Sequence, residues 1–231
     1  MSAARVRVAL VPPAPDALPP AVCAVAIDVL RATSTLAVAV AHGATRIIPF
    51  ATTHEALAHR DAHPGTLVCG ERDGRIVAGF DLGNSPVEYP PERMRGATLA
   101  FASTTGSRAM LAGSRARRRR LASFVALSAC VEALADEPDV VLVCAGKLGR
   151  FALEDAACAG TIAARLAARG ARLDGDGARF AVTLAVDDAT QVRALVEGSD
   201  HGRWLQGLGP AFAADVVVCA TLDAQPTVVG W

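Results

Sequence analysis

Five short polar segments interrupt an apolar chain, and their side chains could bind an anion and a divalent cation. The chain has 231 residues, of which 52% are hydrophobic. Its single lysine, asparagine and tyrosine (Lys147, Asn84 and Tyr89) all lie inside two of these segments. In so biased a composition, a rare residue type that survives is more readily explained by its chemistry than by chance. The segments therefore indicate a functional site.

The first segment is D-V-L-R-A-T-S-T, which follows the apolar run V-C-A-V-A-I and leads into a helix. Asp28 could hold a divalent cation, and Arg31 could bind phosphate or carboxylate through two parallel hydrogen bonds. The hydroxyl groups of Thr33, Ser34 and Thr35 could donate to the same ligand. An ordinary helix start with a capping Asp or Thr explains one or two of these residues. An arginine in the first turn opposes the helix dipole, however, so a functional interpretation is favoured.

Two further segments are G-E-R-D-G and G-F-D-L-G-N-S-P-V-E-Y. The dipeptide D-G predicts a hairpin turn but leaves Glu71 and Arg72 unexplained. Glu71 could be a metal ligand or the partner of a structural ion pair. Asp81 could be a ligand of Mg²⁺, which prefers one or two carboxylates with water and phosphate oxygens. The segment around Asn84 is equally consistent with a tight surface turn.

The fourth segment, S-T-T-G-S-R, joins a predicted strand to a predicted helix. Hydroxyl groups and a glycine at a helix start suit an anion. Serine and threonine also cap helices routinely, so this segment is weak on its own. The candidate anion-binding residues here are Ser103, Thr104, Thr105, Gly106 and Ser107.

The fifth segment, C-A-G-K-L-G-R-F-A-L-E-D, follows the run V-V-L-V-C. Lys147 and Arg150 add positive charge beside two glycines that allow a ligand close to the backbone. Glu154 and Asp155 fall in the first turn of a long helix, where acids are favoured by the helix dipole alone. Cys144 and Arg150 also have the spacing of a cysteine-dependent phosphatase loop, in which a thiolate attacks phosphorus. That pattern is loose and ranks second.

The composition excludes several other classes of function. The formal net charge is zero, so no global field attracts nucleic acid or a membrane surface. The run R-A-R-R-R-R has no interleaved aromatic residues and is interpreted as a solvated surface. Six scattered cysteines without a C-x-x-C pair predict reduced thiols in the cytoplasm. No apolar run has the length of a membrane span.

β-prone runs alternate with alanine-rich helical stretches, which predicts an α/β protein with three α/β/α layers and a mostly parallel or mixed central sheet. A single domain over residues 1–231 is expected, because the composition does not divide the chain. The expected helices are 33–42, 53–61, 106–113, 128–136, 152–169, 188–197 and 201–208. The expected strands are V-R-V-A-L-V, V-C-A-V-A-I, R-I-I-P-F, T-L-V-C-G, T-L-A-F-A, L-A-S-F-V-A-L, V-V-L-V-C and D-V-V-V-C-A.

Taken in order, the five segments resemble the motifs of the 2-phosphosulfolactate phosphatase family, and the match covers most of the chain. The resemblance implies a Mg²⁺-dependent hydrolase that removes phosphate from 2-phospho-3-sulfolactate, a step toward coenzyme M, and it implies a homodimer. The family pattern has asparagines where this chain has Thr105 and Ala126. Another small phosphorylated hydroxy acid is therefore an alternative substrate.

The hypothesis is thus a Mg²⁺-dependent phosphatase acting on a small, strongly anionic phosphomonoester. A thiolate phosphatase using Cys144, and an anion-binding protein without catalysis, are the alternatives. The residues expected to act in catalysis are Asp28, Arg31, Glu154 and Asp155. The metal ligands are expected among Asp28, Glu71, Asp81, Glu154 and Asp155. Substrate contacts are expected from Thr33, Ser34, Thr35, Arg72, Asn84, Ser103, Thr104, Thr105, Gly106, Ser107, Lys147 and Arg150.

Overall fold

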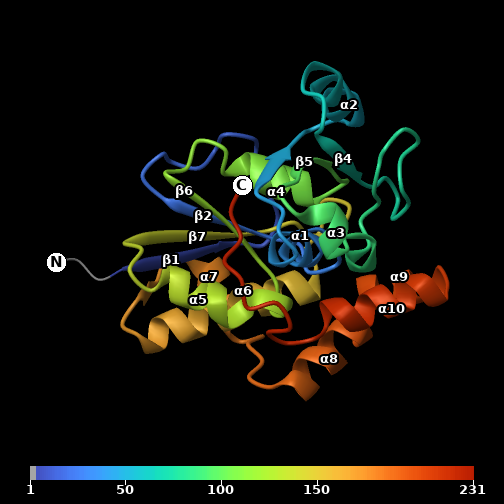
Figure 1. The fold of residues 1–231 in the computed structure, drawn as a ribbon. Helices are drawn as coiled ribbons and strands as arrows, with labels where there is room; N and C mark the ends of the chain where they lie inside the picture. Colours follow the sequence, from blue (N-terminus) through green and yellow to red (C-terminus); the bar gives the residue numbers. More distant parts are fainter. Residues whose placement is uncertain (1–3) are drawn as a thin grey trace.

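Two parallel β-sheets organise the protein, and the computed structural model describes residues 4–231 (Figure 1). The larger sheet has the strand order β6-β2-β7-β1-β8, and the smaller has the order β3-β5-β4. The strands of the larger sheet are β1 (Arg5–Ala9), β2 (Cys23–Ile27), β6 (Arg118–Ala122), β7 (Asp139–Cys144) and β8 (Arg172–Leu173). Those of the smaller sheet are β3 (Arg46–Pro49), β4 (Leu67–Gly70) and β5 (Thr98–Ala102).

Helices cover both faces of the larger sheet (Figure 1). Strand β2 is wholly buried, and its alternate side chains divide between the two faces, as the pleat of a strand requires. The covering helices are α1 (Ala32–Ala41), α4 (Gly106–Ala112), α5 (Leu127–Leu134) and α6 (Leu153–Ala168). Cys23, Val25 and Ile27 pack with α5 and α6, whereas Ala24 and Ala26 pack with α1 and α4. The predicted three-layer α/β/α arrangement is confirmed.

The smaller sheet was not predicted as a separate layer. Leu99 and Phe101 of β5 join the same apolar cluster as α1 and α4. Ala100 and Ala102 face the other way, toward α2 (Thr53–Ala62). The helices α1 and α4 therefore lie between the two sheets. The prediction of one domain for residues 1–231 stays a prediction.

Four helices follow β7 and α6 at the C-terminal end of the chain, and three of them group at one side of the molecule (Figure 1). They are α7 (Asp176–Val182), α8 (Ala189–Gly198), α9 (Asp200–Gly207) and α10 (Pro210–Cys219). The remaining helical segments are 3₁₀ turns at Pro86–Glu88 and Phe124–Ala126, and the short α3 (Pro91–Met94). No helix in residues 4–231 has both the length and the apolar character needed to cross a bilayer.

Two predicted strands were wrong. The run D-V-V-V-C-A belongs to α10, which begins at Pro210 and buries Asp215, Val216 and Cys219 on one side. Spacings of three and four residues place these side chains on one helical face, and packing of that face overrides the β-propensity of the valines. The run L-A-S-F-V-A-L contains only the end of β6, followed by the 3₁₀ turn. The arginine-rich run itself forms most of β6.

The carboxyl ends of four strands carry the polar segments. Ile27 of β2 pairs in register with Cys144 of β7, so Asp28 and the loop of Lys147 leave the larger sheet together. Gly70 of β4 pairs with Ala102 of β5, so the segments that begin at Glu71 and Ser103 leave the smaller sheet together. Polar residues far apart in sequence are thereby brought to one place.

Candidate active site

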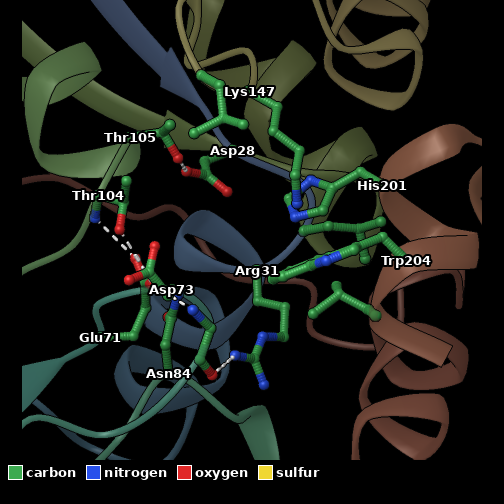
Figure 2. Close-up of a pocket in the computed structure, with 14 residues that line it drawn as sticks. Asp28, Arg31, Glu71, Asp73, Asn84, Thr104, Thr105, Lys147, His201 and Trp204 are labelled. Atoms are coloured by element: carbon green, nitrogen blue, oxygen red, sulfur yellow. Dashed lines mark hydrogen bonds between the residues drawn. The ribbon is translucent and has the colours of Figure 1, made fainter. Parts of the chain in front are cut away.

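A cavity of about 240 Å³ lies where these four strands end. Figure 2 shows its polar side chains converging from separate segments of the chain. Seven of the predicted site residues line it: Asp28, Arg31, Glu71, Asn84, Thr104, Thr105 and Lys147. The other lining residues are Leu30, Asp73, Gly74, Leu148, His201, Trp204 and Leu205.

Asp28 is a buried carboxylate at the centre of the cavity wall. Its Oδ1 accepts a hydrogen bond from the Ala32 backbone N–H at 3.2 Å, and its Oδ2 accepts one from the Thr105 hydroxyl at 2.9 Å. Burial raises the pKa of Asp28, and the nearby His201 and the Thr105 hydroxyl partly oppose the rise. Thr105, where the family pattern has asparagine, therefore holds a carboxylate in place. Ala126 is buried and does not line the cavity.

Glu71 is held by the segment that follows β5. Its Oε1 accepts from the Thr104 backbone N–H at 2.7 Å, and its Oε2 accepts from the Thr104 hydroxyl at 3.2 Å. The Gly74 N–H also donates to Oε2, at 2.7 Å, which closes the turn after β4. Asn84 lies beside this turn, and its buried Oδ1 has no hydrogen-bond partner among residues 4–231. One hard oxygen atom is thus left available to a ligand.

Arg31 is committed to protein partners. Its Nη1 lies 2.5 Å from Asp215 Oδ2, and both side chains are buried. Its Nη2 donates to the Gly74 carbonyl oxygen at 2.6 Å, and its guanidinium carbon lies 5.0 Å from the centre of the Phe212 ring. The Leu30–Arg31 peptide bond is cis. In this arrangement Arg31 connects α1 to α10 and to the turn after β4.

Lys147 reaches the cavity from the loop after β7. Its Nζ lies 3.3 Å from the centre of a Trp204 ring, and Figure 2 shows the side chain extending toward His201 and Trp204. Partial burial lowers the pKa of Lys147 to about 8, against the opposing effect of Glu154, Asp28 and Glu71. The structure places no carboxylate within 4.0 Å of this ammonium group in residues 4–231.

Neither acid of the first turn of α6 lines this cavity, although Glu154 lines a second cavity that shares Lys147 and His201 with it. Asp155 accepts hydrogen bonds from the backbone N–H groups of Val29, at 2.8 Å, and Gly146, at 2.9 Å. Burial, together with Asp28 and Glu154, raises the pKa of Asp155 well above its ordinary value. Asp155 therefore fastens the loops after β2 and β7 to each other. Glu154 Oε1 lies 3.1 Å from His201 Nδ1, whereas its buried Oε2 has no hydrogen-bond partner among residues 4–231.

Several predicted substrate contacts instead stabilise the backbone around the site. The hydroxyl groups of Thr33 and Ser34 donate to the carbonyl oxygens of Asp28 and Val29, and that of Thr35 donates to the carbonyl oxygen of Asn84. None of these three residues lines the cavity.

Three residues of the fourth segment likewise lie outside the lining. Ser103 and Ser107 cap each other, because each hydroxyl oxygen accepts from the other residue's N–H, at 2.9 and 3.0 Å. Gly106 allows α4 to approach Asp28: a Cβ there would lie 2.9 Å from Asp28 Oδ2 and 2.5 Å from Ala32 Cβ. These residues fix where the segment runs.

Four further predicted residues also lie outside the cavity lining. Asp81 Oδ2 accepts from the Val68 N–H at 2.8 Å, and Arg72 donates to the carbonyl oxygen of Glu71 at 2.7 Å. Arg150 is exposed at the tip of its loop. Cys144 is fully buried, and desolvation raises the pKa of its thiol well above the ordinary value.

Helix α9 supplies the wall that sequence analysis missed. His201, Trp204 and Leu205 are spaced three and four residues apart, so they share one face of the helix. That spacing is the signal that could have found them, but the sequence did not show where the helix would pack. Across residues 4–231, no three His, Cys, Asp or Glu side chains are grouped closely enough to hold a metal ion among themselves.

The fold and the cavity define a three-layer α/β protein with a carboxylate- and ammonium-lined site at the ends of parallel strands. Comparison with known proteins places it more narrowly. Residues 11–231 match the family model described as 2-phosphosulpholactate phosphatase. The chain belongs to this family, and it is a phosphoric monoester hydrolase by class.

Relatives are similar over most of their length. A protein of Thermotoga petrophila is 43% identical over 206 residues, which is 89% of this chain and 87% of the relative. One of Synechococcus sp. (strain JA-3-3Ab) is 41% identical, with 90% and 89% covered. One of Deinococcus radiodurans is 39% identical, with 97% and 93% covered. Each is named "Probable 2-phosphosulfolactate phosphatase".

Proposed function

We propose that this protein is a Mg²⁺-dependent phosphatase that releases inorganic phosphate from 2-phospho-3-sulfolactate or a similar small, anionic phospho-hydroxy acid. The observation that supports it most is the cavity itself, where buried carboxylates stand opposite an ammonium group that has no carboxylate partner in residues 4–231. The names of the relatives support the choice of substrate.

The donor set around the cavity fits a hard divalent cation. Mg²⁺ is usually bound by one or two carboxylates and completes its shell with water and phosphate oxygens. Asp28 and Glu71 supply the carboxylates, and the Oδ1 of Asn84 is a buried oxygen without a partner among residues 4–231. When bound, Mg²⁺ neutralises phosphate charge and lowers the pKa of a coordinated water.

The remaining residues recognise the substrate and exclude water. Lys147 contributes a positive charge to the cavity for the anionic groups. The hydroxyl groups of Thr104 and Thr105 donate hydrogen bonds to Glu71 and Asp28, so they position the carboxylates rather than the substrate. Leu30 and Leu205 are buried and line the cavity with apolar surface, which strengthens charge interactions inside it.

The alternative thiolate mechanism has no support from the geometry. A catalytic cysteine needs an accessible thiolate with a lowered pKa. The Cys144 thiol is fully buried with its pKa raised, and it does not line the cavity.

The test measures phosphate release from 2-phospho-3-sulfolactate and from phospholactate, with EDTA and with Mg²⁺ restored. We expect EDTA to abolish release and Mg²⁺ to restore it. Cys144→Ser should retain activity, and Asp28→Asn should lose it. Activity that survives EDTA but is lost in Cys144→Ser would favour the thiolate. No release from either ester, with anion binding retained, would indicate a non-catalytic anion-binding protein.

The cytoplasmic location, the homodimer and a role in coenzyme M formation remain predictions. Six cysteines without a disulfide in the structure are consistent with a reducing compartment. Gel filtration would determine the oligomeric state.

A further inference from the structure

The ammonium group of Lys147, the only lysine of the chain, lies over the aromatic ring of Trp204. Trp204 is about two-fifths exposed (39%) and lines the cavity. The ring is fixed from two other sides. A Cβ at Gly74 would lie 3.2 Å from the ring, and the His201 ring centre lies 5.7 Å away. The indole is therefore held in place by the turn after β4 and by its own helix.

The two cations of the cavity differ in how they are held. Arg31 is neutralised by Asp215, and its second nitrogen is bound to the Gly74 carbonyl oxygen. An incoming anion would meet a charge that Asp215 already neutralises. Lys147 instead rests over an aromatic face. The ring attracts the ammonium charge through its quadrupole and does not neutralise it.

Contact with an aromatic ring leaves the N–H donors of the Lys147 ammonium group free to bind a ligand. A lysine has three N–H donors and a flexible four-carbon stem that loses conformational freedom when fixed. Holding the stem over Trp204 removes part of that entropic cost before the ligand arrives. With its pKa lowered to about 8, Lys147 is still mostly charged at neutral pH.

We propose that Trp204 is a positioning residue that holds Lys147 as the anion receptor of the cavity, for phosphate or for the second anionic group of the substrate. The proposal rests on the phosphatase function proposed above. It assigns to α9 a part in substrate binding and gives Arg31 a structural task.

The first test uses the two tryptophans of the chain, Trp204 and Trp231. Trp231 lines a separate arginine-rich groove, so Trp231→Phe leaves Trp204 as the single indole reporter without touching the site. Inorganic phosphate is titrated into this variant without metal. We expect a saturable change in fluorescence as Lys147 shifts toward the anion. In the double variant Trp231→Phe/Lys147→Met the change should disappear. An unchanged response in the double variant, or none in Trp231→Phe, would overturn the proposal.

The second test compares steady-state kinetics. Trp204→Leu removes the aromatic face, and we expect KM to rise roughly three- to thirtyfold with kcat within about threefold, as the strength of cation–π contacts implies. Trp204→Phe keeps an aromatic face and should recover most of the loss. Equal losses in both variants, or an unchanged KM in Trp204→Leu, would show that the indole serves packing alone. If Trp204→Leu does not fold, the fluorescence titration with phosphate tests the proposal, because both of its variants retain Trp204.

The outcomes also separate this inference from the proposed function. Lysine-dependent phosphate binding without turnover of any ester would retain the receptor and reject the phosphatase. Full turnover with a KM that Trp204→Leu leaves unchanged would retain the phosphatase and reject the positioning role of Trp204.

Discussion

Arg31 and Asp215 are 184 positions apart in sequence, and their side chains meet at 2.5 Å in a buried ion pair. The other carboxylate oxygen of Asp215 accepts from the Ser85 hydroxyl, also at 2.5 Å. One carboxylate of α10 thereby joins the start of α1 and the loop before α3. Because Arg31 lines the cavity, the pair connects α10 to the cavity wall.

Removing Asp215 should destabilise the protein strongly. Asp215→Ala leaves the Arg31 guanidinium buried without its counter-charge, and breaking a buried pair costs about 3–5 kcal/mol. Urea denaturation should show that loss in the free energy of unfolding. The matched control is Asp200→Ala, which removes a fully exposed partner of Arg203 and should leave the free energy of unfolding nearly unchanged. Equal stability of the two variants would contradict a structural ion pair.

The contact between Arg31 and Asp215 also shows which part of the structure could not be predicted from the sequence. The polar segment from Asp28 to Thr35 could be placed at a strand end and a helix start, so the cavity wall was predictable. Asp215 lies in a run of β-branched residues that predicts a strand. Only packing against distant elements makes it a helix, and no local pattern reveals the partner of Arg31.

Asp155 should matter for stability more than for chemistry. Its two oxygens satisfy the backbone N–H groups of Val29 and Gly146, which Asp155→Ala would leave buried and unpaired. Each such group costs about 1–3 kcal/mol, so we expect a loss of about 2–6 kcal/mol. Asp155→Asn retains one acceptor oxygen, so its free energy of unfolding should lie between those of the wild type and Asp155→Ala.

The exposed Asp176→Ala is the control for this series, measured by urea denaturation. If Asp155→Ala is as stable as wild type but binds no metal, Asp155 is a ligand, and the assignment to the backbone is wrong.

Gly106 should be required for its lack of a side chain. A methyl group there would lie 2.9 Å from Asp28 Oδ2 and 2.5 Å from Ala32 Cβ. Gly106→Ala should therefore displace Asp28 and lower kcat/KM by about tenfold or more, although alanine is favoured over glycine in helices by about 0.5–1 kcal/mol. Gly198→Ala, where no atom lies within 4 Å, should leave activity unchanged. Wild-type kinetics in Gly106→Ala would show that α4 can shift without cost.

The site was predictable from sequence on one side only. Asp28 and Lys147 follow adjacent parallel strands, and such strand ends meet at one edge of a sheet. His201 and Trp204 belong to α9, whose sequence contains no motif that indicates binding or catalysis. Its position depends on how α8, α9 and α10 pack against the core, which is a property of the whole chain.

Activity should decline in alkaline solution because of Lys147. Its pKa in the folded protein is lowered from 10.5 to about 8. Below that pH the ammonium group is charged and attracts the anionic substrate; as the pH rises through about 8 the proton is lost and the attraction with it. We expect kcat/KM, which reports the free enzyme, to fall above pH 8 by up to about tenfold per unit.

Lys147→Arg tests the assignment of that decline. Arginine stays protonated across the pH range in which Lys147 titrates, so the variant should lose the alkaline limb even if its overall activity is lower. Lys147→Met should show low kcat/KM at every pH, and its pH profile should have no decline near pH 8. The comparison is made with the ester substrate at constant ionic strength, because surface charge effects vary with salt. A limb near pH 8 that persists in Lys147→Arg would assign the titration to another group and remove Lys147 as the receptor of the anion.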